Sequence, residues 1–400
     1  MGLLHATPTR GKEVFAFTYN DEWLASSHAH VLDPSLRLLS GPQHAPQGRE
    51  NFGVFLDSSP DRFGRVLLKR REALRARTEG RRARALTELD VLLGVFDGHR
   101  FGALRFRRPE GPFLDDDASL ASPPWTSLRA LEQASLRIEA EGVEDDPRYG
   151  KWLQLLLAPG RSLGGARPKA SVVDDRGRLW IAKFPSVDDE EDIGAWEDVA
   201  HALAMKAGIV CAEATSQRFG SRHRTFMTRR FDRSDDGARL HAASAMTLLE
   251  RQDGDDGASY LDIASAIVQG GARVAADLEQ LWRRIVFFMC ISNVDDHLRN
   301  HAFLLDAKGW LLAPAYDMNP VSFGDGLTLN VSHDENTQDI ALAFEVAEFF
   351  RVKPKRSRAI VDEVAAAVRT WREEAKARGL SRAAQERMAG AFRLVDEEST

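Results

Sequence analysis

The chain has 400 residues, 43% of them hydrophobic, which is enough to bury more than one core and excludes a single small module. Because 60 Asp and Glu residues outnumber 54 Lys and Arg residues, the net charge of -6 excludes a general affinity of the whole protein for nucleic acid or anionic membranes. Two distant cysteines in apolar surroundings exclude a disulfide framework, and neither a signal peptide nor a bilayer-spanning run is found. These features predict a soluble cytoplasmic protein with no membrane partner.

Residues 1–107 are expected to form a small N-terminal α/β subdomain. Apolar runs predict strands at 14–19 and 23–26, a helix across 61–96, and a final strand at 101–106.

The expected helix of this subdomain is unusually basic. Between Arg62 and Arg84 the chain carries nine Arg and one Lys against two Glu. Such a stretch can face phosphates or an acidic partner, or it can be a solvated face that acidic neighbours neutralise. The sequence leaves both interpretations open.

A linker is expected at 108–126, where prolines, serines, glycine and an acidic run disfavour regular structure. Beyond it, the patterning predicts a strand-rich lobe over 127–235 and a mostly helical lobe with one hairpin over 236–400. The predicted fold class is therefore α+β.

Two adjacent glycines, Gly164 and Gly165, precede the first strands of the strand-rich lobe. They allow backbone amides to approach an anion closely, and Arg167 and Lys169 add positive charge nearby. A Gly-Gly pair is also common in ordinary turns, and this one matches neither the Walker pattern nor the loop with three spaced glycines.

Lys183 lies on the second of two predicted strands that follow, in phase with apolar residues, so its amine is expected to point into an apolar cleft. A glycine loop followed by a strand lysine is how a kinase holds nucleotide phosphates, although such a lysine can also snorkel at a strand edge. Glu197 stands beside the apolar stripe of a predicted helix that ends at Gly208. It either reaches Lys183 or is an exposed acidic residue favoured by the helix dipole.

The most polar stretch, NVDDHLRN at 293–300, follows the apolar end of a predicted helix. Taken alone, it can be a helix that ends in water. Asp295 and Asn300, however, have the D-x-x-x-x-N spacing at which a phosphotransferase loop presents a base and a magnesium-binding amide. A strand, a turn and a second strand then lead to Asp317, which supplies a carboxylate of the kind magnesium prefers.

In this order the motifs resemble the HipA-type serine/threonine kinases of bacterial toxin-antitoxin modules. SLGGARPK is similar to their phosphate-binding loop, IAKFP to their strand lysine, RRFDR to their interlobe hinge, NVDDHLRN to their catalytic loop and LAPAYD to their metal-binding aspartate. The N-terminal FGVFLDSSPDRFGR and GALRF resemble that family's small subdomain. The resemblance implies a bilobal protein-kinase-like fold with a strand-rich nucleotide lobe and an all-α C-terminal lobe.

The same resemblance implies ATP and Mg²⁺ as cofactors and gives individual residues their roles. Asp295 would accept the proton of the substrate hydroxyl, and Asn300 and Asp317 would hold magnesium. Lys183, with Glu197 as its partner, would bind the ATP phosphates. The rest of the ATP site would comprise Ser162, Gly164, Gly165, Ala166, Arg167, Lys169, Arg229, Arg230, Phe231, His297, Arg299 and Tyr316.

Ser162 opens the glycine loop, and the resemblance implies that its autophosphorylation regulates the enzyme. Two negative charges there would oppose the ATP phosphates and switch the enzyme off. The sequence departs from the family at Gly164, Arg299 and His301, where alanine can occur, lysine is common and phenylalanine is usual. None of these departures removes a catalytic group.

The implied partners are a small helix-turn-helix antitoxin similar to HipB, operator DNA bound mainly through that antitoxin, and a cytoplasmic protein substrate, for which an aminoacyl-tRNA synthetase is one candidate. The alternative is a kinase-like co-repressor whose main role is to bind a DNA-bound antitoxin. A third interpretation, a metal-dependent hydrolase built on Asp295, His297, His301 and Asp317, leaves the glycine loop and Lys183 unexplained.

Overall fold

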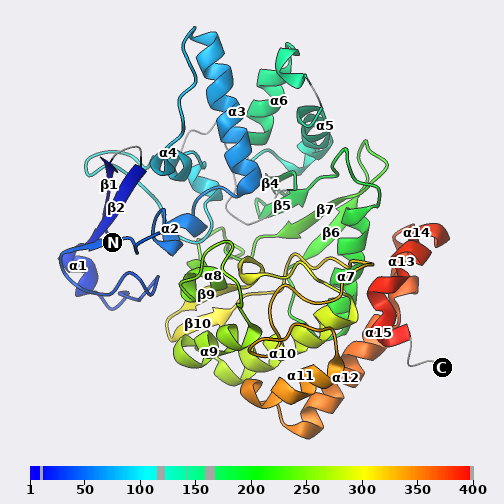
Figure 1. Ribbon diagram of the computed structural model, residues 1–400. Helices are drawn as coiled ribbons and strands as arrows, with labels where there is room; N and C mark the ends of the chain where they lie inside the picture. Colours follow the sequence, from blue (N-terminus) through cyan, green and yellow to red (C-terminus); the bar gives the residue numbers. More distant parts are fainter. Residues whose placement is uncertain (10–11, 115–121, 141, 158–166, 397–400) are drawn as a thin grey trace. The chain divides into compact units, whose positions relative to one another are not determined.

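The chain divides into two compact units, each made of two segments (Figure 1). Unit 1 comprises Met1–Ala182 and Asp232–Asp253, and unit 2 comprises Lys183–Phe231 and Gly254–Thr400. Two of the three boundaries between these segments fall inside the region expected to form the strand-rich lobe, and the third falls inside the expected helical lobe. The structure is a computed structural model, and the residues it describes are 1–9, 12–114, 122–140, 142–157 and 167–396.

Unit 1 begins with an antiparallel sheet of three strands. β1 (Gly2–Thr9) pairs with β2 (Lys12–Tyr19), which pairs in turn with β3 (Pro42–His44). Alternate side chains of β2, among them Phe15 and Phe17, are buried, as the period of two requires for a strand with one face on a core. The strand predicted at 14–19 is thus confirmed.

Three helices of unit 1 pack together (Figure 1). α3 (Arg62–Thr78) lies against α6 (Tyr149–Leu157), which lies against α5 (Leu128–Ile138). The N-cap of α3 is Asp61, whose carboxylate accepts a hydrogen bond from the backbone of Gly64 (2.8 Å). The other elements of the unit are α1 (Asp21–Leu24), α2 (Gly53–Asp57), α4 (Glu88–Leu93), α8 (Ala245–Leu248), β4 (Lys169–Val173), β5 (Leu179–Lys183, of which the last residue belongs to unit 2), β8 (Ala242–Ser244) and the 3-10 turns Asp97–His99, Trp125–Ser127 and Val143–Asp145.

The helix predicted across 61–96 is in fact two helices. α3 stops just before Gly80, which adopts a φ of 63° that favours glycine. α4 then starts with a capping box, in which Thr87 and Asp90 each accept a hydrogen bond from the other's backbone. The predicted continuous helix was wrong because this break and second cap were not recognised.

Two strands predicted in the N-terminal subdomain are wrong. Residues 23–26 contain the end of α1 and a turn, because two acidic residues in the first turn of α1 complement its helix dipole. Residues 101–106 form no strand, because Gly102 has a φ of 72° and donates its N–H to the carboxylate of Asp232 (2.8 Å). An apolar composition therefore did not determine an extended backbone at either place.

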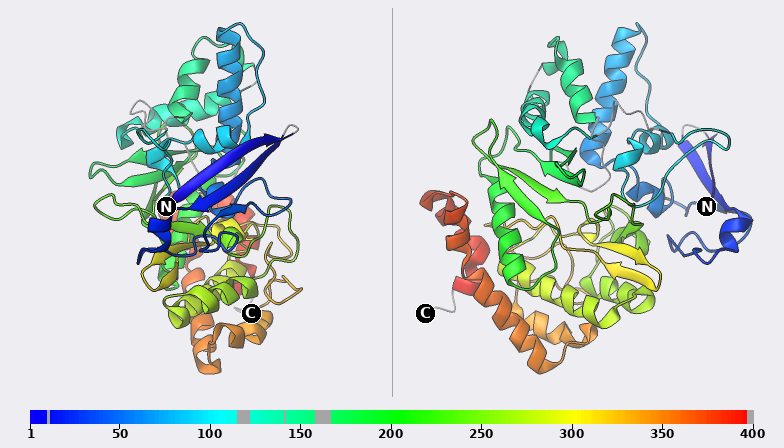
Figure 2. Two further views of the ribbon diagram at one scale, coloured as in Figure 1. Left: turned by 90° about the vertical axis from the view of Figure 1, so that its left-hand side faces the viewer. Right: turned by 180° about the vertical axis from the view of Figure 1, so that it is seen from behind.

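The core of unit 2 forms around α10 (Val274–Cys290). Every side chain of its last ten residues, 281–290, is buried, as predicted for the apolar run before the polar stretch. α9 (Tyr260–Gly270), α11 (Ile340–Val346) and α12 (Pro354–Val368) pack against it, and the right view of Figure 2 shows the orange α12 beside the yellow-green α10.

Two antiparallel strand pairs and the helix α7 complete the part of unit 2 that carries the motifs. β6 (Ala214–Gln217) pairs with β7 (Thr225–Arg229), and β9 (Ala302–Asp306) pairs with β10 (Gly309–Leu312), the hairpin that the sequence predicts. α7 (Ile193–Lys206) is the predicted helix before Gly208. The remaining elements are the helices α13 (Trp371–Ala377), α14 (Arg382–Met388) and α15 (Arg393–Asp396) and the 3-10 turns Leu298–Asn300, Ala347–Phe350 and Ala389–Phe392.

Several arginines of α3 and of the residues after it form ion pairs with carboxylates of unit 1. Among these pairs are Arg65–Glu88 (2.8 Å), Arg77–Asp145 (3.2 Å), Arg81–Glu72 (2.6 Å) and Arg84–Asp90 (2.5 Å). These pairs support the interpretation that acidic neighbours neutralise a solvated face.

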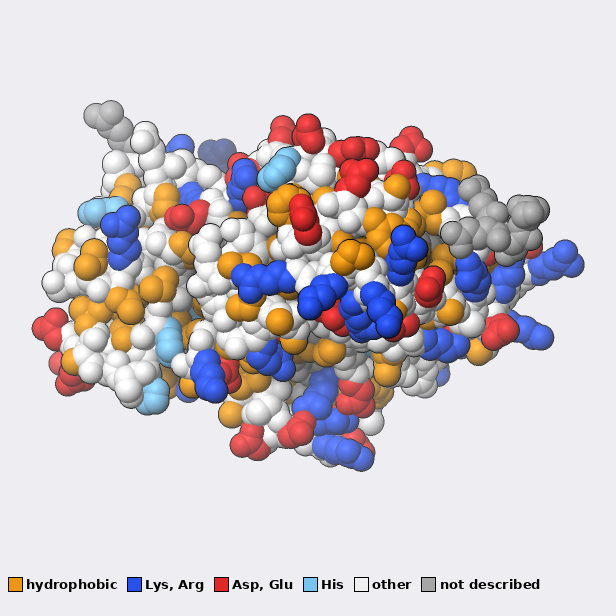
Figure 3. Space-filling model, turned by 90° about the horizontal axis from the view of Figure 1, so that it is seen from below, with side chains coloured by type: hydrophobic (Ala, Val, Ile, Leu, Met, Phe, Trp, Pro, Cys, Tyr) orange, Lys and Arg blue, Asp and Glu red, His pale blue; other side chains and the backbone are white. Residues whose placement is uncertain are grey.

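On another face, the one seen from below in Figure 3, Lys and Arg side chains are interspersed with Asp and Glu. Within the described ranges, none of the helices has the length and apolar character needed to cross a bilayer.

Candidate active site

The polar stretch 293–300 forms a loop between the buried end of α10 and β9. Ser292 leaves α10 with a φ of 47°, which turns the chain sharply at the start of the loop. Asn293 is buried, and its Oδ1 accepts a hydrogen bond from the backbone of Asn319 (2.9 Å). The loop is therefore held to the segment that follows β10.

The two adjacent aspartates of this loop lie in opposite environments. Asp296 is buried and accepts hydrogen bonds from the hydroxyl of Tyr260 and from Nε2 of His301, each at 2.7 Å. Burial, together with the negative charge of Asp296, raises the pKa of Tyr260 well above its usual value, so this hydroxyl remains a donor. Asp295, one residue earlier, is exposed. Asp296 anchors the loop, and Asp295 is available for chemistry.

Lys183, at the end of β5, holds two carboxylates of unit 2 together. Its Nζ donates to Oε1 of Glu197 on α7 and to Oδ1 of Asp317, each at 2.5 Å. Burial opposes the charged form, yet the carboxylates of Asp317 and Glu197 outweigh it and raise the pKa of Lys183. The lysine is therefore a fixed cation, with a side chain only 12% exposed.

Asp317 follows β10 in an unusual backbone conformation. Its φ is 60°, which is costly for a residue with a side chain and persists only where the surroundings hold it. Asn319 supplies one such restraint, because its Nδ2 donates to Oδ1 of Asp317 (3.3 Å). The Tyr316 hydroxyl supplies another by donating to the carbonyl of Arg299 in the loop (2.6 Å). The strained turn thus directs the Asp317 carboxylate to Lys183.

Asn300 is buried at the end of the loop. Its Nδ2 donates to the backbone carbonyl of Asp295 (3.3 Å), which fixes the amide and identifies Oδ1 as the atom that a cation would contact. The same hydrogen bond links Asn300 to the backbone of the exposed aspartate. The predicted base and amide ligand are therefore parts of one closed loop.

The donor atoms around Asp317 fit a magnesium ion carried by a nucleotide. Carboxylate and amide oxygens are hard ligands, and Oδ1 of Asn319 is a buried acceptor that no donor of the described chain satisfies. No group of three or more His, Cys, Asp or Glu side chains in the described ranges could hold a metal alone. Magnesium commonly takes one or two carboxylates and completes its shell with phosphates and water.

The structure also describes several residues that are predicted to contact the nucleotide. The ring of Phe231 lies 5.3 Å from that of Tyr316, between centroids. His297 is partly buried, and its Nδ1 has no hydrogen-bond partner among the described residues. Arg230 is buried, and Arg229, at the end of β7, lies 3.9 Å from a carboxylate oxygen of Glu213. Their contacts with ATP stay predictions.

The predicted phosphate-binding loop is only partly described. Arg167 is half-buried, and Lys169 is buried with its Nζ 3.2 Å from Oδ2 of Asp61. Contact of Lys169 with a phosphate would require this buried ion pair to open, which is energetically costly. Ser162, Gly164, Gly165 and Ala166 lie outside the described residues.

The structure separates the four side chains of the hydrolase interpretation. His301 is buried and engaged with Asp296, so it is no ligand for a metal beside Asp295. Asp317 contacts Lys183 instead of a histidine. A two-metal site needs several acidic and imidazole ligands around one point, and that arrangement is absent from the described residues.

Three residues that help to build the site were not predicted from the sequence. Asn293 and Asp296 fix the loop, and Asn319 restrains Asp317. The position of Asn319, two residues after a metal-binding aspartate, is a signal that could have been noticed. The partner of Asp296 could not, because Tyr260 lies 36 residues away in sequence.

Comparisons with known proteins concern the fold and the family of the chain. A chain in the solved complex of HipA, HipB and operator DNA, from a toxin-antitoxin system of Shewanella oneidensis MR-1, matches with a TM-score of 0.67 and 18% identity, over 98% of this chain and 93% of that one. The Helicobacter pylori proinflammatory kinase CtkA matches with a TM-score of 0.38 and 13% identity, over 58% of this chain and 95% of that one. No curated protein matches the sequence.

The first of these structures confirms the predicted α+β, HipA-like fold. A model of the HipA-like C-terminal domain matches residues 161–371, which is more than half of the chain. This match contains Lys183, Glu197, the loop 293–300 and Asp317. The chain belongs to the family of proteins with a HipA-like C-terminal domain.

Proposed function

We propose that the protein is an ATP-dependent serine/threonine protein kinase that acts as the toxin of a bacterial toxin-antitoxin module. The observation that carries the proposal is the double contact of Lys183 with Glu197 and Asp317. The neighbours of Asp317, Tyr316 and Asn319, are in turn hydrogen-bonded to the loop that exposes Asp295. Phosphoryl transfer requires positioning and neutralisation of charge more than covalent chemistry by the protein. A buried lysine and an oxygen-rich turn supply both requirements.

Each of these side chains has a defined task in this reaction. Asp295 accepts the proton of the substrate hydroxyl at its carboxylate, and the hydrogen bond from Asn300 to its backbone holds the loop in place. Glu197 keeps the Lys183 amine charged and oriented toward the phosphates. Asn300 and Asp317 would hold magnesium. When bound, the magnesium–ATP complex supplies the transferable phosphoryl group and the divalent charge that neutralises it.

The contact between Lys183 and Asp317 has a consequence for nucleotide binding. Lys183 is proposed to bind the ATP phosphates and Asp317 to bind their magnesium, and in the structure these two side chains form an ion pair with each other. In the structure, the charges of Lys183 and Asp317 therefore neutralise each other. With magnesium–ATP bound, Asp317 would hold the ion and Lys183 would contact a phosphate oxygen.

Regulation and partners are part of the same proposal. Phosphate on Ser162 would place negative charge in the loop that binds phosphates and so reduce activity. The similarity to a HipA that is bound to HipB and operator DNA supports a DNA-binding antitoxin as a partner. A cytoplasmic protein is the proposed substrate, with aminoacyl-tRNA synthetases as one candidate class, and growth arrest leading to persistence is the proposed outcome.

A comparison of phosphoproteomes tests this function and identifies the substrate together. Cells would express the wild-type chain, Asp295→Ala, or Asp362→Ala, which removes an exposed aspartate from α12 as a matched control. The proposal expects growth arrest and new phosphoserine or phosphothreonine sites with the wild type and the control, and neither with Asp295→Ala. Absence of new phosphorylated sites with the wild type, together with salt-dependent retention of DNA by the purified chain, would favour the co-repressor alternative.

A further inference from the structure

Three consecutive residues of α7 contact three different parts of unit 2. Trp196 packs into the aromatic core, Glu197 binds Lys183, and Asp198 binds the guanidinium of Arg378. Successive residues on a helix point in directions about 100° apart, which follows from 3.6 residues per turn. The orientation of Glu197 is therefore fixed by contacts on either side of it.

The apolar part of this attachment is an aromatic cluster. The ring of Trp196 lies 6.2 Å from Trp371 and 6.3 Å from Phe392, between centroids, and the last two are stacked 4.3 Å apart. All three side chains are at most 1% exposed. The cluster joins α7 to the helices that end the chain.

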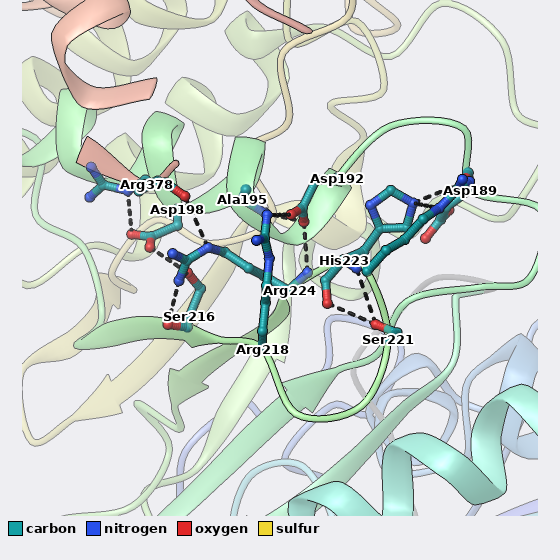
Figure 4. A network of polar contacts seen from close by, with 11 residues as sticks. Asp189, Asp192, Ala195, Asp198, Ser216, Arg218, Ser221, His223, Arg224 and Arg378 are labelled. Carbon is teal, nitrogen blue, oxygen red and sulfur yellow. Dashed lines mark hydrogen bonds and ion pairs between the residues drawn. The ribbon is translucent and has the colours of Figure 1, made fainter. Parts of the chain in front are cut away.

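The polar part centres on Arg378, the residue that follows α13 (Figure 4). Its Nε lies 3.0 Å from Oδ1 of Asp198, although the N–H does not point at that oxygen, so the contact is an ion pair without a hydrogen bond. Nη1 donates to Oε2 of Glu374 (2.5 Å). The other oxygen of Asp198 accepts a hydrogen bond from the hydroxyl of Ser216 on β6 (2.6 Å). Arg378 and Asp198 are 17% and 14% exposed, so solvent screens their attraction only partly.

The backbone of Arg378 extends the network to the beginning of α7. Its carbonyl accepts a hydrogen bond from Nε of Arg224 (3.2 Å), and the backbone N–H of Arg224 donates to Asp192 (2.8 Å). Asp192 is the N-cap of α7 and accepts from the backbone of Ala195 (3.1 Å). Figure 4 shows these groups linked from Arg378 through Arg224 to Asp192.

A second ion pair holds the other end of α7 to α13. Nζ of Lys206 lies 2.6 Å from Oε1 of Glu374 and donates to the hydroxyl of Thr370 (3.1 Å). Burial alone would raise the pKa of Glu374, but hydrogen bonds from Lys206 and Arg378 lower it, so this carboxylate stays charged. α7 is thus tied to α13 near both of its ends.

We propose that Arg378 is a positioning residue, which holds α7 so that Glu197 meets Lys183. The inference rests on the proposed kinase function, since that function gives the Glu197–Lys183 pair its importance. Residues 372–396 lie beyond the part of the chain matched by the family model, so the helices that hold α7 extend past that domain. Arg378 touches none of the reacting groups and acts through α7.

The first test measures how firmly α7 and Glu197 are held in place, and it does not depend on catalysis. Hydrogen exchange of the α7 amides and the rate at which an amine-acylating reagent labels Lys183 would be compared in the wild type, Arg378→Ala and Lys376→Ala. Lys376 is an exposed cation on α13, two residues before Arg378, and serves as the matched control. Arg378→Ala is expected to speed both measurements several-fold, because α7 opens more often when this contact is lost and the buried amine is then exposed to the reagent. Lys376→Ala is expected to match the wild type, and Arg378→Lys to restore part of the effect. If Arg378→Ala fails to fold, Asp198→Asn removes the same ion pair.

The second test measures phosphate transfer with magnesium–ATP, well below the unfolding temperature of each variant. Arg378→Ala is expected to lower kcat roughly tenfold, a typical size for coupling through a positioning contact, while Lys376→Ala leaves kcat unchanged. Wild-type exchange and labelling in Arg378→Ala, or faster exchange with an unchanged kcat, would overturn the inference. Absence of transfer by the wild type would contradict the proposed function instead, and exchange and labelling would then decide the inference.

Discussion

The two aspartates of the loop show how neighbouring residues of one type acquire different tasks. Asp295 is exposed, whereas Asp296 is buried between Tyr260 and His301. The spacing to Asn300 predicts a catalytic role for Asp295, and it predicts no role for Asp296. The buried carboxylate has two donors, which is the arrangement that makes a buried charge tolerable.

This difference predicts that two neighbouring alanine substitutions change the free energy of unfolding by very different amounts. Asp296→Ala is expected to lower the free energy of unfolding by about 3 kcal/mol, because it leaves the Tyr260 hydroxyl and the His301 ring without their buried acceptor. Asp295→Ala is expected to change it by less than about 0.5 kcal/mol, since an exposed side chain is lost. Urea unfolding measures both. Equal destabilisation by the two substitutions would show that Asp296 does not anchor the loop.

At the scale of the element, α7 depends on a close approach to β7. A Cβ added to Gly194 would lie 2.1 Å from the backbone carbonyl oxygen of Arg224, a distance that no real contact allows. Glycine is needed at the start of this helix because only hydrogen fits there. The helix can therefore present Glu197 to Lys183 from a fixed starting point.

Gly194→Ala is expected to destabilise the protein by about 2 kcal/mol, because helix and strand must separate to admit the methyl group. Thermal or urea unfolding checks this value. The matched control is Gly111→Ala, where an added Cβ meets nothing within 4 Å, and its effect is expected to be small. A Gly194→Ala protein as stable as the wild type would mean that α7 has room to move.

The break between α3 and α4 makes the stability of unit 1 sensitive to acid. Hydrogen bonds from Arg84, the largest cause, and from Thr87 lower the pKa of Asp90 from 3.8 to about 2. A carboxylate whose pKa is lower in the folded state contributes stability above its unfolded value, and this contribution is lost as the pH falls toward the folded value. The relevant window therefore lies between about pH 4 and pH 2.

The comparison of wild type with Asp90→Asn tests this window. The variant is expected to be less stable by roughly 1 kcal/mol or less at neutral pH, as for other partly exposed ion pairs. The difference is expected to stay constant down to about pH 4 and to shrink below it, because the wild-type carboxylate then becomes protonated. A difference that does not change with pH would show that the charge of Asp90 contributes nothing to stability.

At the scale of the whole molecule, the sequence predicts the elements that carry the motifs better than those of the N-terminal subdomain. α7, α10 and the β9–β10 hairpin have strong local periodicity, and their order is enough to identify the family. The strands predicted at 23–26 and 101–106 failed because a helix dipole and a glycine with positive φ outweighed apolar composition. Local pattern was decisive only where no such competing interaction existed.

The sequence indicated the candidate site residues themselves, but it did not indicate the contacts that hold them in place. Spacing and residue chemistry indicated Lys183, Asp295, Asn300 and Asp317. The anchoring of Asp296 by Tyr260 and the attachment of α7 by Arg378 join residues far apart in sequence, so they depend on the tertiary fold. Such long-range contacts leave no periodic signal in a single sequence.

Transfer of labelled phosphate from magnesium–ATP to protein, measured with the purified chain, tests the central claim most directly. The wild type and the exposed control Asp362→Ala are expected to incorporate phosphate, into themselves or into an added protein substrate. Lys183→Met, Asp295→Ala and Asp317→Ala are expected to be folded and to incorporate none above background. Incorporation at the wild-type rate by either aspartate variant would contradict the assignment of these residues to phosphoryl transfer.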